Sequence, residues 1–279
     1  MKKIINLENG KGLLKLKWNG SLSSLQFNSP LSLHWLDCMG SLGKFFVILP
    51  YNKEYREEIQ KQFSKSFNGE LEINEKTFNV LFEILELFEN STYELFYEPE
   101  YRYEIDDSWN WEYITNKRDS TTNPEIYDTI NSQTPEDLSK IYSVTESFYD
   151  GNNESLLFTQ PLEIINKDRI KYYEELIKKG LRPTAIIYYG LLEESGIYDD
   201  GSIWKSINRS GLYILDGHHK LMAYKRLNQA PSLMRIIKRY NSKDDFNLTK
   251  QEFKNEIADR LYKSQIKHIK ENCQLKYAT

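Results

Sequence analysis

The second half of the chain alternates between short apolar runs and helical patterns, and this alternation restricts its fold more than any other feature. Runs rich in β-branched and aromatic residues are typical of buried strands, and glycine or proline follows several of them. The predicted elements are, in order, a helix capped by Asp168 and closed by Gly180, a strand at 183–189, a polar excursion at 193–210, a strand at 212–215, a helix at 220–227 and a strand at 233–237.

The first half predicts a smaller unit of sheet and helix. Residues 13–18 alternate Leu with Lys as a half-buried strand does, Asn19-Gly20 is a hairpin-type turn pair, and residues 44–49 form a compact apolar run. Apolar residues at helical spacing follow in residues 52–67 and 74–88. We therefore expect two amphipathic helices on a small sheet.

Length and charge together predict two domains. A chain of 279 residues is long enough for two cores. Acids exceed bases up to a polar break at 150–154, and bases exceed acids after it. We expect an α+β protein with a separate, small N-terminal sheet-and-helix domain at residues 1–153 and a mixed α/β domain at 154–279. The second domain ends in a helix that opens with a capping box at 249–252.

Composition favours a folded cytoplasmic protein. Hydrophobic residues make up 39% of the chain and charged residues 28%, with 20 Tyr, 13 Phe and 5 Trp to fill a core. No apolar run is long enough for a membrane helix, and Glu8 interrupts the N-terminus before a signal-peptide core forms. Cys38 and Cys273 lie far apart without Cys-x-x-Cys spacing, so we expect reduced thiols.

Residues 83–112 are strongly acidic and rich in aromatic residues. Ten acids there face a single base, Arg102. One interpretation is a solvated face whose aromatic side chains turn inward. The other is a docking surface for a basic protein partner, or for the basic half of this same chain.

The most specific motif is Asp216-Gly217-His218-His219-Lys220, which joins a predicted strand to a predicted helix. Glycine lets the backbone approach a ligand, and the unpaired N–H groups at a helix start attract anions. The motif therefore predicts a phosphate site formed by Gly217, His218, His219 and Lys220. Asp216 is the candidate for a Mg²⁺ ligand or a proton acceptor, and His218 and His219 are the further catalytic candidates.

Other charged residues are weaker candidates for the same chemistry. Acids on the preceding helix and after the first strand are alternative proton acceptors, and two arginines are alternative phosphate ligands: Glu174, Glu175, Glu193, Glu194, Arg182 and Arg209. Each is also typical of a solvated surface. A zinc site built on the His pair is not expected, because adjacent helical residues point about 100° apart. A basic rim in the second half could face nucleic acid or solvent: Lys225, Arg226, Arg235, Lys238, Arg239 and Lys243.

Three segments resemble the ParB/sulfiredoxin-like superfamily, over residues 160–240 only. They are Ile177 to Ile187, Tyr213 to Tyr224 with its Asp-Gly-His-His-Lys box, and Pro231 to Ile236. The box is most similar to the Asp-Gly-His type of the free-serine-kinase branch. Gly217 and Ala223 also match the box of partition proteins, whereas His218 stands where sulfiredoxins carry their attacking Cys, so peroxiredoxin repair is not expected.

The resemblance implies a nucleotide (ATP, ADP or CTP) with Mg²⁺ as cofactors and a carboxylate that accepts the proton of a hydroxyl acceptor. The leading hypothesis is therefore nucleotide-dependent phosphotransfer to a small hydroxyl compound. Two alternatives stay open: nucleic-acid binding or cleavage by a basic half that the acidic half masks, and a non-catalytic protein-interaction module.

Overall fold

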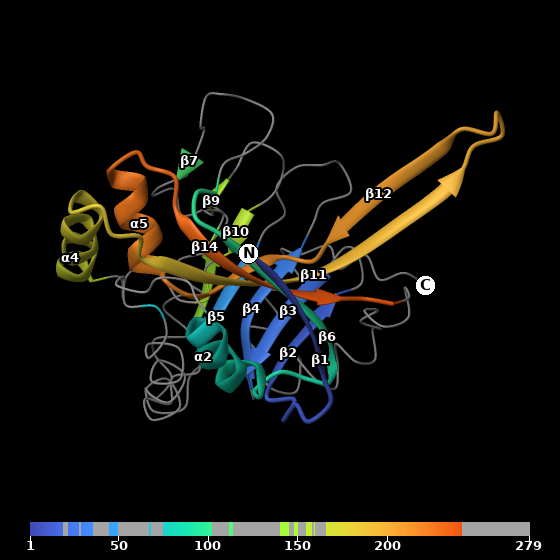
Figure 1. Ribbon diagram of the computed structural model, residues 1–279, viewed down its shortest axis with the longest axis horizontal. Helices are drawn as coiled ribbons and strands as arrows, with labels where there is room; N and C mark the ends of the chain where they lie inside the picture. The colour runs from blue at the N-terminus through green and yellow to red at the C-terminus, as the bar shows by residue number, and fades with distance from the viewer. Residues whose placement is uncertain are drawn as a thin grey trace, which may run out of the picture.

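The computed structural model contains two β-sheets and helices at the end and edge of the larger one (Figure 1). The fold is mixed α and β, as expected. The structure describes residues 1–18, 22–27, 29–35, 45–49, 67, 75–101, 112–113, 140–144, 148–149, 155–157, 159 and 166–241. The predicted turn at Asn19-Gly20, nearly all of the helix at 52–67 and the C-terminal helix opening at 249–252 lie outside these residues.

The larger sheet has nine strands and combines both halves of the chain. Its order is β1 (Lys2–Leu7), β6 (Ser91–Glu98), β14 (Ser232–Arg239), β11 (Thr184–Ile197), β13 (Leu212–Asp216), β10 (Ser155–Leu157), β9 (Phe148–Tyr149) and β7 (Glu112–Tyr113), and β12 (Ile203–Arg209) pairs with β11. Central strands β11 and β14 run parallel, and β14 runs antiparallel to β6. Strands β11 and β14 are buried on both faces over most of their length, as strands between layers are.

The second sheet has five strands from the first half of the chain. Its order is β2 (Leu14–Trp18), β3 (Leu22–Phe27), β4 (Ser29–Trp35), β5 (Phe45–Leu49) and β8 (Lys140–Val144). In β2 the buried residues alternate with exposed lysines, which confirms the strand that its Leu-Lys alternation predicted. Helix α2 (Glu75–Leu85) confirms the predicted amphipathic helix and buries Phe78, Leu81 and Leu85.

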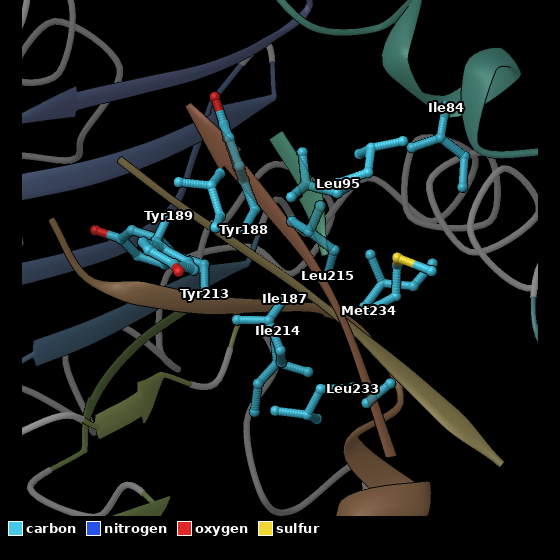
Figure 2. Packing of buried hydrophobic residues seen from close by; sticks show 14 of the residues in the cluster. Ile84, Leu95, Ile187, Tyr188, Tyr189, Tyr213, Ile214, Leu215, Leu233 and Met234 are labelled. Carbon is cyan, nitrogen blue, oxygen red and sulfur yellow. The ribbon is translucent and has the colours of Figure 1, made fainter. Parts of the chain in front are cut away.

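One hydrophobic cluster joins the two sheets and α2. It includes Leu14 and Leu16 of β2, Ile84 of α2 and the central residues of β6, β11, β13 and β14. Figure 2 shows Ile84, Leu95 and Tyr188 among the side chains that meet in this cluster. Tyr213 of β13 also shares a hydrogen bond with Ser23 of β3, so a buried polar contact ties the two sheets.

The described residues on the two sides of the predicted domain boundary share this core and one sheet. Strand β6 of the first half pairs with β14 of the second along seven residue pairs. The expected separate N-terminal domain is therefore, in its described part, continuous with the C-terminal half. The break at 150–154 itself lies outside the described residues.

The charge difference between the halves is neutralised where β6 meets β14. Carboxylates of the acidic segment bind cations of the basic half in four ion pairs: Glu98 with Arg235 (2.8 Å), Glu89 with Lys238 (2.7 Å), Glu100 with Arg182 (2.9 Å) and Glu94 with Arg239. Glu94 is buried, and its hydrogen bonds to Lys2 and Arg239 lower its pKa although burial opposes them. These acids therefore bind cations of the basic half of the same chain.

The second half follows the predicted order of elements, with two differences. Helices α4 (Lys167–Lys178) and α5 (His218–Arg226) and strands β11, β13 and β14 lie where they were expected. However, the polar excursion at 193–210 is mostly strand, because β11 continues to Ile197 and turns back as β12. Helix α5 begins at His218, two residues earlier than predicted, so both histidines lie on the helix.

No helix in the described ranges is sufficiently long and apolar to cross a membrane.

Candidate functional site

Helix α5 begins directly after β13, at a glycine that no other residue could replace without strain. Gly217 has φ +105°, in the left-handed region. A Cβ atom at this position would lie 2.6 Å from the Cβ of Ala185 and 2.9 Å from its Cα, on the neighbouring strand β11. Glycine is required here for two reasons, the backbone conformation and the close packing of the helix start on the sheet.

The start of α5 carries no capping side chain. The first hydrogen bond of the helix runs from Leu221 N–H to Gly217 O (2.9 Å), so the N–H groups of residues 218–220 precede it. No side chain caps Gly217, and the first turn contains no acid. The positive end of this helix dipole is therefore not neutralised within the helix.

Helix α4 packs on α5 and brings a second helix start to the same place. The two helices bury a small apolar cluster that includes Ile170, Tyr173 and Tyr224. Asn166 caps α4, since its side-chain oxygen accepts hydrogen bonds from the second and third residues after it (2.8 and 3.2 Å). The backbone N–H of Asn166 donates to Nε2 of His219 (3.0 Å). The two helix N-termini thus meet at His219.

The sequence predicted Asp168 as the cap of α4, and this prediction was wrong by two residues. Asn and Asp are about equally good caps, and Asp168 lies in the first turn, where an acid also stabilises a helix. A cap two residues earlier places the start of α4 against His219.

Lys220 is fully enclosed and already bound. Its side chain is 2% exposed, and Nζ donates to Asp216 Oδ2 (2.6 Å) and to the backbone oxygen of Thr184 (2.9 Å). The ammonium group also lies 5.9 Å from the centre of the Tyr173 ring. The predicted phosphate ligand therefore serves as a buried counter-charge that fixes Asp216 beneath the start of α5.

His218 points into the protein and acts as a hydrogen-bond acceptor. The His218 residue is 5% exposed, and its Nε2 atom accepts a hydrogen bond from the backbone N–H of Thr159 (3.1 Å). Burial lowers the pKa of His218 to about 3, with a smaller contribution from His219. The imidazole is neutral at physiological pH, and because Nε2 accepts, Nδ1 carries the proton.

His219 is half-buried and lies at the surface of the site. Burial, and then the charge of Arg169 in the first turn of α4, lower its pKa to about 4. It too is neutral with Nε2 as acceptor, so Nδ1–H is a donor. Burial, and then the Asp216 charge, raise the pKa of Tyr173. His219 therefore lies where the two helix starts meet, with Arg169 in the first turn of α4 and Asp216 just before α5.

The junction is suited to hold an anion more than a cation. Two helix N-termini and Arg169 contribute positive potential, and the Asp216 carboxylate is balanced by Lys220. No three His, Cys, Asp or Glu side chains gather as metal ligands in the part of the chain that the structure describes. One carboxylate with an oxygen bound by ammonium does not by itself make a Mg²⁺ site.

The remaining candidates lie outside the junction. Glu174 binds Arg226 (3.3 Å) and Glu175 binds Lys178 (3.0 Å), both on helix surfaces, and Arg182 binds Glu100. Three others lie on β11 and β12 near the base of their hairpin, which projects away from α4 and α5 (Figure 1): Glu193, Glu194 and Arg209. Of the basic rim, Arg226, Arg235, Lys238 and Arg239 all bind carboxylates, and Lys243 lies outside the described residues.

Sequence reasoning missed three residues of the junction, namely Thr159, Asn166 and Arg169. Asn166 carried a signal, since Asn before an amphipathic run is a preferred helix cap. Thr159 and Arg169 carried none. They are brought to the histidines only by the packing of α4 and β13.

Comparison with known proteins identifies no relative. The chain matches no protein-family model, no curated protein and no solved structure. The resemblance to the ParB/sulfiredoxin-like superfamily therefore stays a prediction.

Proposed function

We propose that this protein binds the phosphate group of a small ligand, a nucleotide or a phosphorylated metabolite, at the junction of the α4 and α5 N-termini. One observation carries the proposal: two helix starts, of which α5 is uncapped, converge on His219. Helix N-termini offer N–H donors and positive potential, which is the combination that anions require.

The donors come mainly from the backbone and from His219. The N–H groups at positions 219 and 220 lie in the first turn of α5, and the imidazole of His219 contributes Nδ1–H. Arg169 adds a fixed charge in the first turn of α4, and this charge contributes to the lowered pKa of His219. Lys220 does not contact the ligand in this arrangement, but its ion pair reduces the repulsion between Asp216 and a phosphate.

Phosphotransfer would be a further step at the same place. Asp216 is the acid at the site, with Oδ2 held by Lys220, and it is the candidate to accept the proton of a hydroxyl acceptor. Asp216→Asn should then retain ligand binding and lose transfer. ATP, ADP and CTP with Mg²⁺ are the donors to test.

Binding can be tested by thermal unfolding of the full chain with inorganic phosphate, phosphoserine, ATP, ADP or CTP. A ligand at about 100 times its Kd should stabilise the protein by about 2.7 kcal/mol. The decisive variant is His219→Asp. A carboxylate in the first turn favours the helix dipole, so the free protein should keep its stability, but it repels phosphate and should abolish the ligand effect.

His219→Asn is the matched control, because it removes the ring without adding charge and should weaken binding only in part. Wild-type protein that gains no stability from any of the five compounds would refute the proposal. Equal stabilisation of wild type and His219→Asp would also refute it, because the ligand would then lie elsewhere.

A further inference from the structure

A two-stranded arm projects from the end of the larger sheet, and nothing in the site at α5 involves it (Figure 1). Strand β11 pairs with β14 up to Leu191 and then continues with β12 as its only described neighbour to Ile197. Strand β12 pairs with β11 alone among the described strands. Among the described strands, none lies at the outer edge of β12, and such an edge is the usual place for another strand to add.

The arm is ordered by its own contacts. At the tip, Tyr198 N–H donates to Ser202 O (2.7 Å), and Asp200 accepts from the backbone and hydroxyl of Ser202 (2.9 and 2.6 Å). The Trp204 ring covers Gly196, where a Cβ would come within 2.5 Å of the indole. Because these contacts already order the arm, binding of a partner at its edge costs little conformational entropy.

One face of the arm carries three exposed isoleucines among polar and charged side chains. Residues paired across an antiparallel ladder share a face, so Ile197, Ile203 and Ile207 lie on the same side. Their exposed fractions are 73%, 68% and 57%. Isolated two-stranded hairpins are marginally stable in water, so isoleucines exposed along the outer strand β12 favour a partner strand at its edge.

We propose that the edge of β12 pairs with β12 of a second copy of this chain, antiparallel and centred on Ser206. This register uses all seven residues of the strand, Ile203–Arg209. It places Ile203 opposite the partner's Arg209 and Lys205 opposite the partner's Ile207. No like charges face each other directly, whereas centring on Lys205 or on Ile207 would place cations opposite one another.

The same register partly covers Ile207, because the aliphatic stem of Lys205 lies across Ile207 of the other copy. In the row that contains Lys205 and the partner's Ile207, the next strand carries the partner's Glu193, whose side chain is 62% exposed and binds the partner's Arg239 (2.8 Å). Each lysine therefore adds a second cation near a carboxylate of the other copy, twice in a symmetric pair.

Sedimentation equilibrium of the full chain tests this pairing. Because a single pair of strands is a small interface, we expect a dimer that forms over roughly 10 µM to 1 mM. Ile207→Lys places two lysines opposite each other at two symmetric positions and should raise the dimer Kd about tenfold or more. Ile197→Lys is the matched control: it removes a more exposed isoleucine from the inner strand and should leave the Kd within about twofold.

The double variant Lys205→Glu with Ile207→Lys provides a rescue, since each new lysine then faces a glutamate of the other copy. It should restore a Kd close to that of the wild type. A wild-type chain that stays monomeric over this range would overturn the proposal. So would an equal loss in Ile197→Lys and Ile207→Lys, or a double variant no better than Ile207→Lys alone.

Discussion

The buried histidine at the start of α5 makes an acid-sensitive contribution to stability that can be isolated by one substitution. His218 is neutral in the folded protein because its pKa is lowered to about 3. In the unfolded chain a histidine has its ordinary pKa of about 6.5. As the pH falls through that value, the unfolded state takes up the proton first, so stability that is present above pH 6.5 is lost as the pH falls toward 3.

The size of the loss follows from the two pKa values. Between pH 7 and pH 5 only the unfolded chain protonates at this residue, and the free energy of unfolding should fall by about 2 kcal/mol through His218 alone. His219 acts in the same direction, since its pKa is lowered to about 4, but its greater exposure makes its share smaller.

The assay compares urea unfolding of wild type with His218→Gln at pH 7 and pH 5. The glutamine oxygen can accept a hydrogen bond from the Thr159 N–H without titrating. All other titratable groups are shared by the two proteins, so their effects cancel when the two free energies of unfolding are subtracted. The stability of wild type relative to the variant should fall by about 2 kcal/mol between the two pH values. A constant difference would refute the reasoning. If the variant does not fold, NMR titration of His218 in the wild type decides, because a pKa above 6 contradicts a neutral buried ring.

Two further substitutions test the packing beneath the site. Lys220→Met leaves the Asp216 carboxylate and the Thr184 carbonyl without the Lys220 donor, so it should lower the free energy of unfolding by about 3 kcal/mol. Adding Asp216→Asn should recover part of this loss. An unchanged free energy of unfolding in the single variant would contradict the ion pair. Gly217→Ala should lower the free energy of unfolding by about 2–4 kcal/mol, since it combines strain of the left-handed backbone with a clash on strand β11. Gly180→Ala has the same kind of backbone but open space around the new Cβ atom, so it should lower the free energy of unfolding by about 1 kcal/mol. Equal costs in the two glycine variants, measured by the same urea unfolding, would show that the clash is relieved.

The sequence predicted the elements of the second half well because their patterns are local. The apolar runs at 183–189 and 212–215 are buried on both faces, and such strands keep their character whatever they pack against. The arm was missed for the opposite reason. Its strands have no buried face, so the alternation of Ile203, Lys205 and Ile207 resembled a polar loop.

The candidate site shows the same limit. The strand-to-helix turn at Gly217 was predicted correctly, because its neighbours in sequence define it. The sequence assigned the glycine to the approach of a ligand, whereas the structure requires it for backbone conformation and for packing on β11. The roles of Lys220 and His218 depend on what covers them, and those contacts come from β11 and from Thr159, far away in sequence. Residue type indicated phosphate chemistry for both side chains, but burial decides which atoms remain available.

The pairing of β6 with β14 determines what a truncated form of this protein would do. A fragment that begins near residue 155 would lack β6 and so leave one side of β14 bare. Arg235 and Lys238 would lose the carboxylates that bind them, and Arg239 would keep only Glu193. Such a fragment would adhere to polyanions and to itself. Retention of nucleic acid by that fragment would therefore result from the deletion itself. Only the intact chain can show whether the protein has a native affinity for nucleic acid.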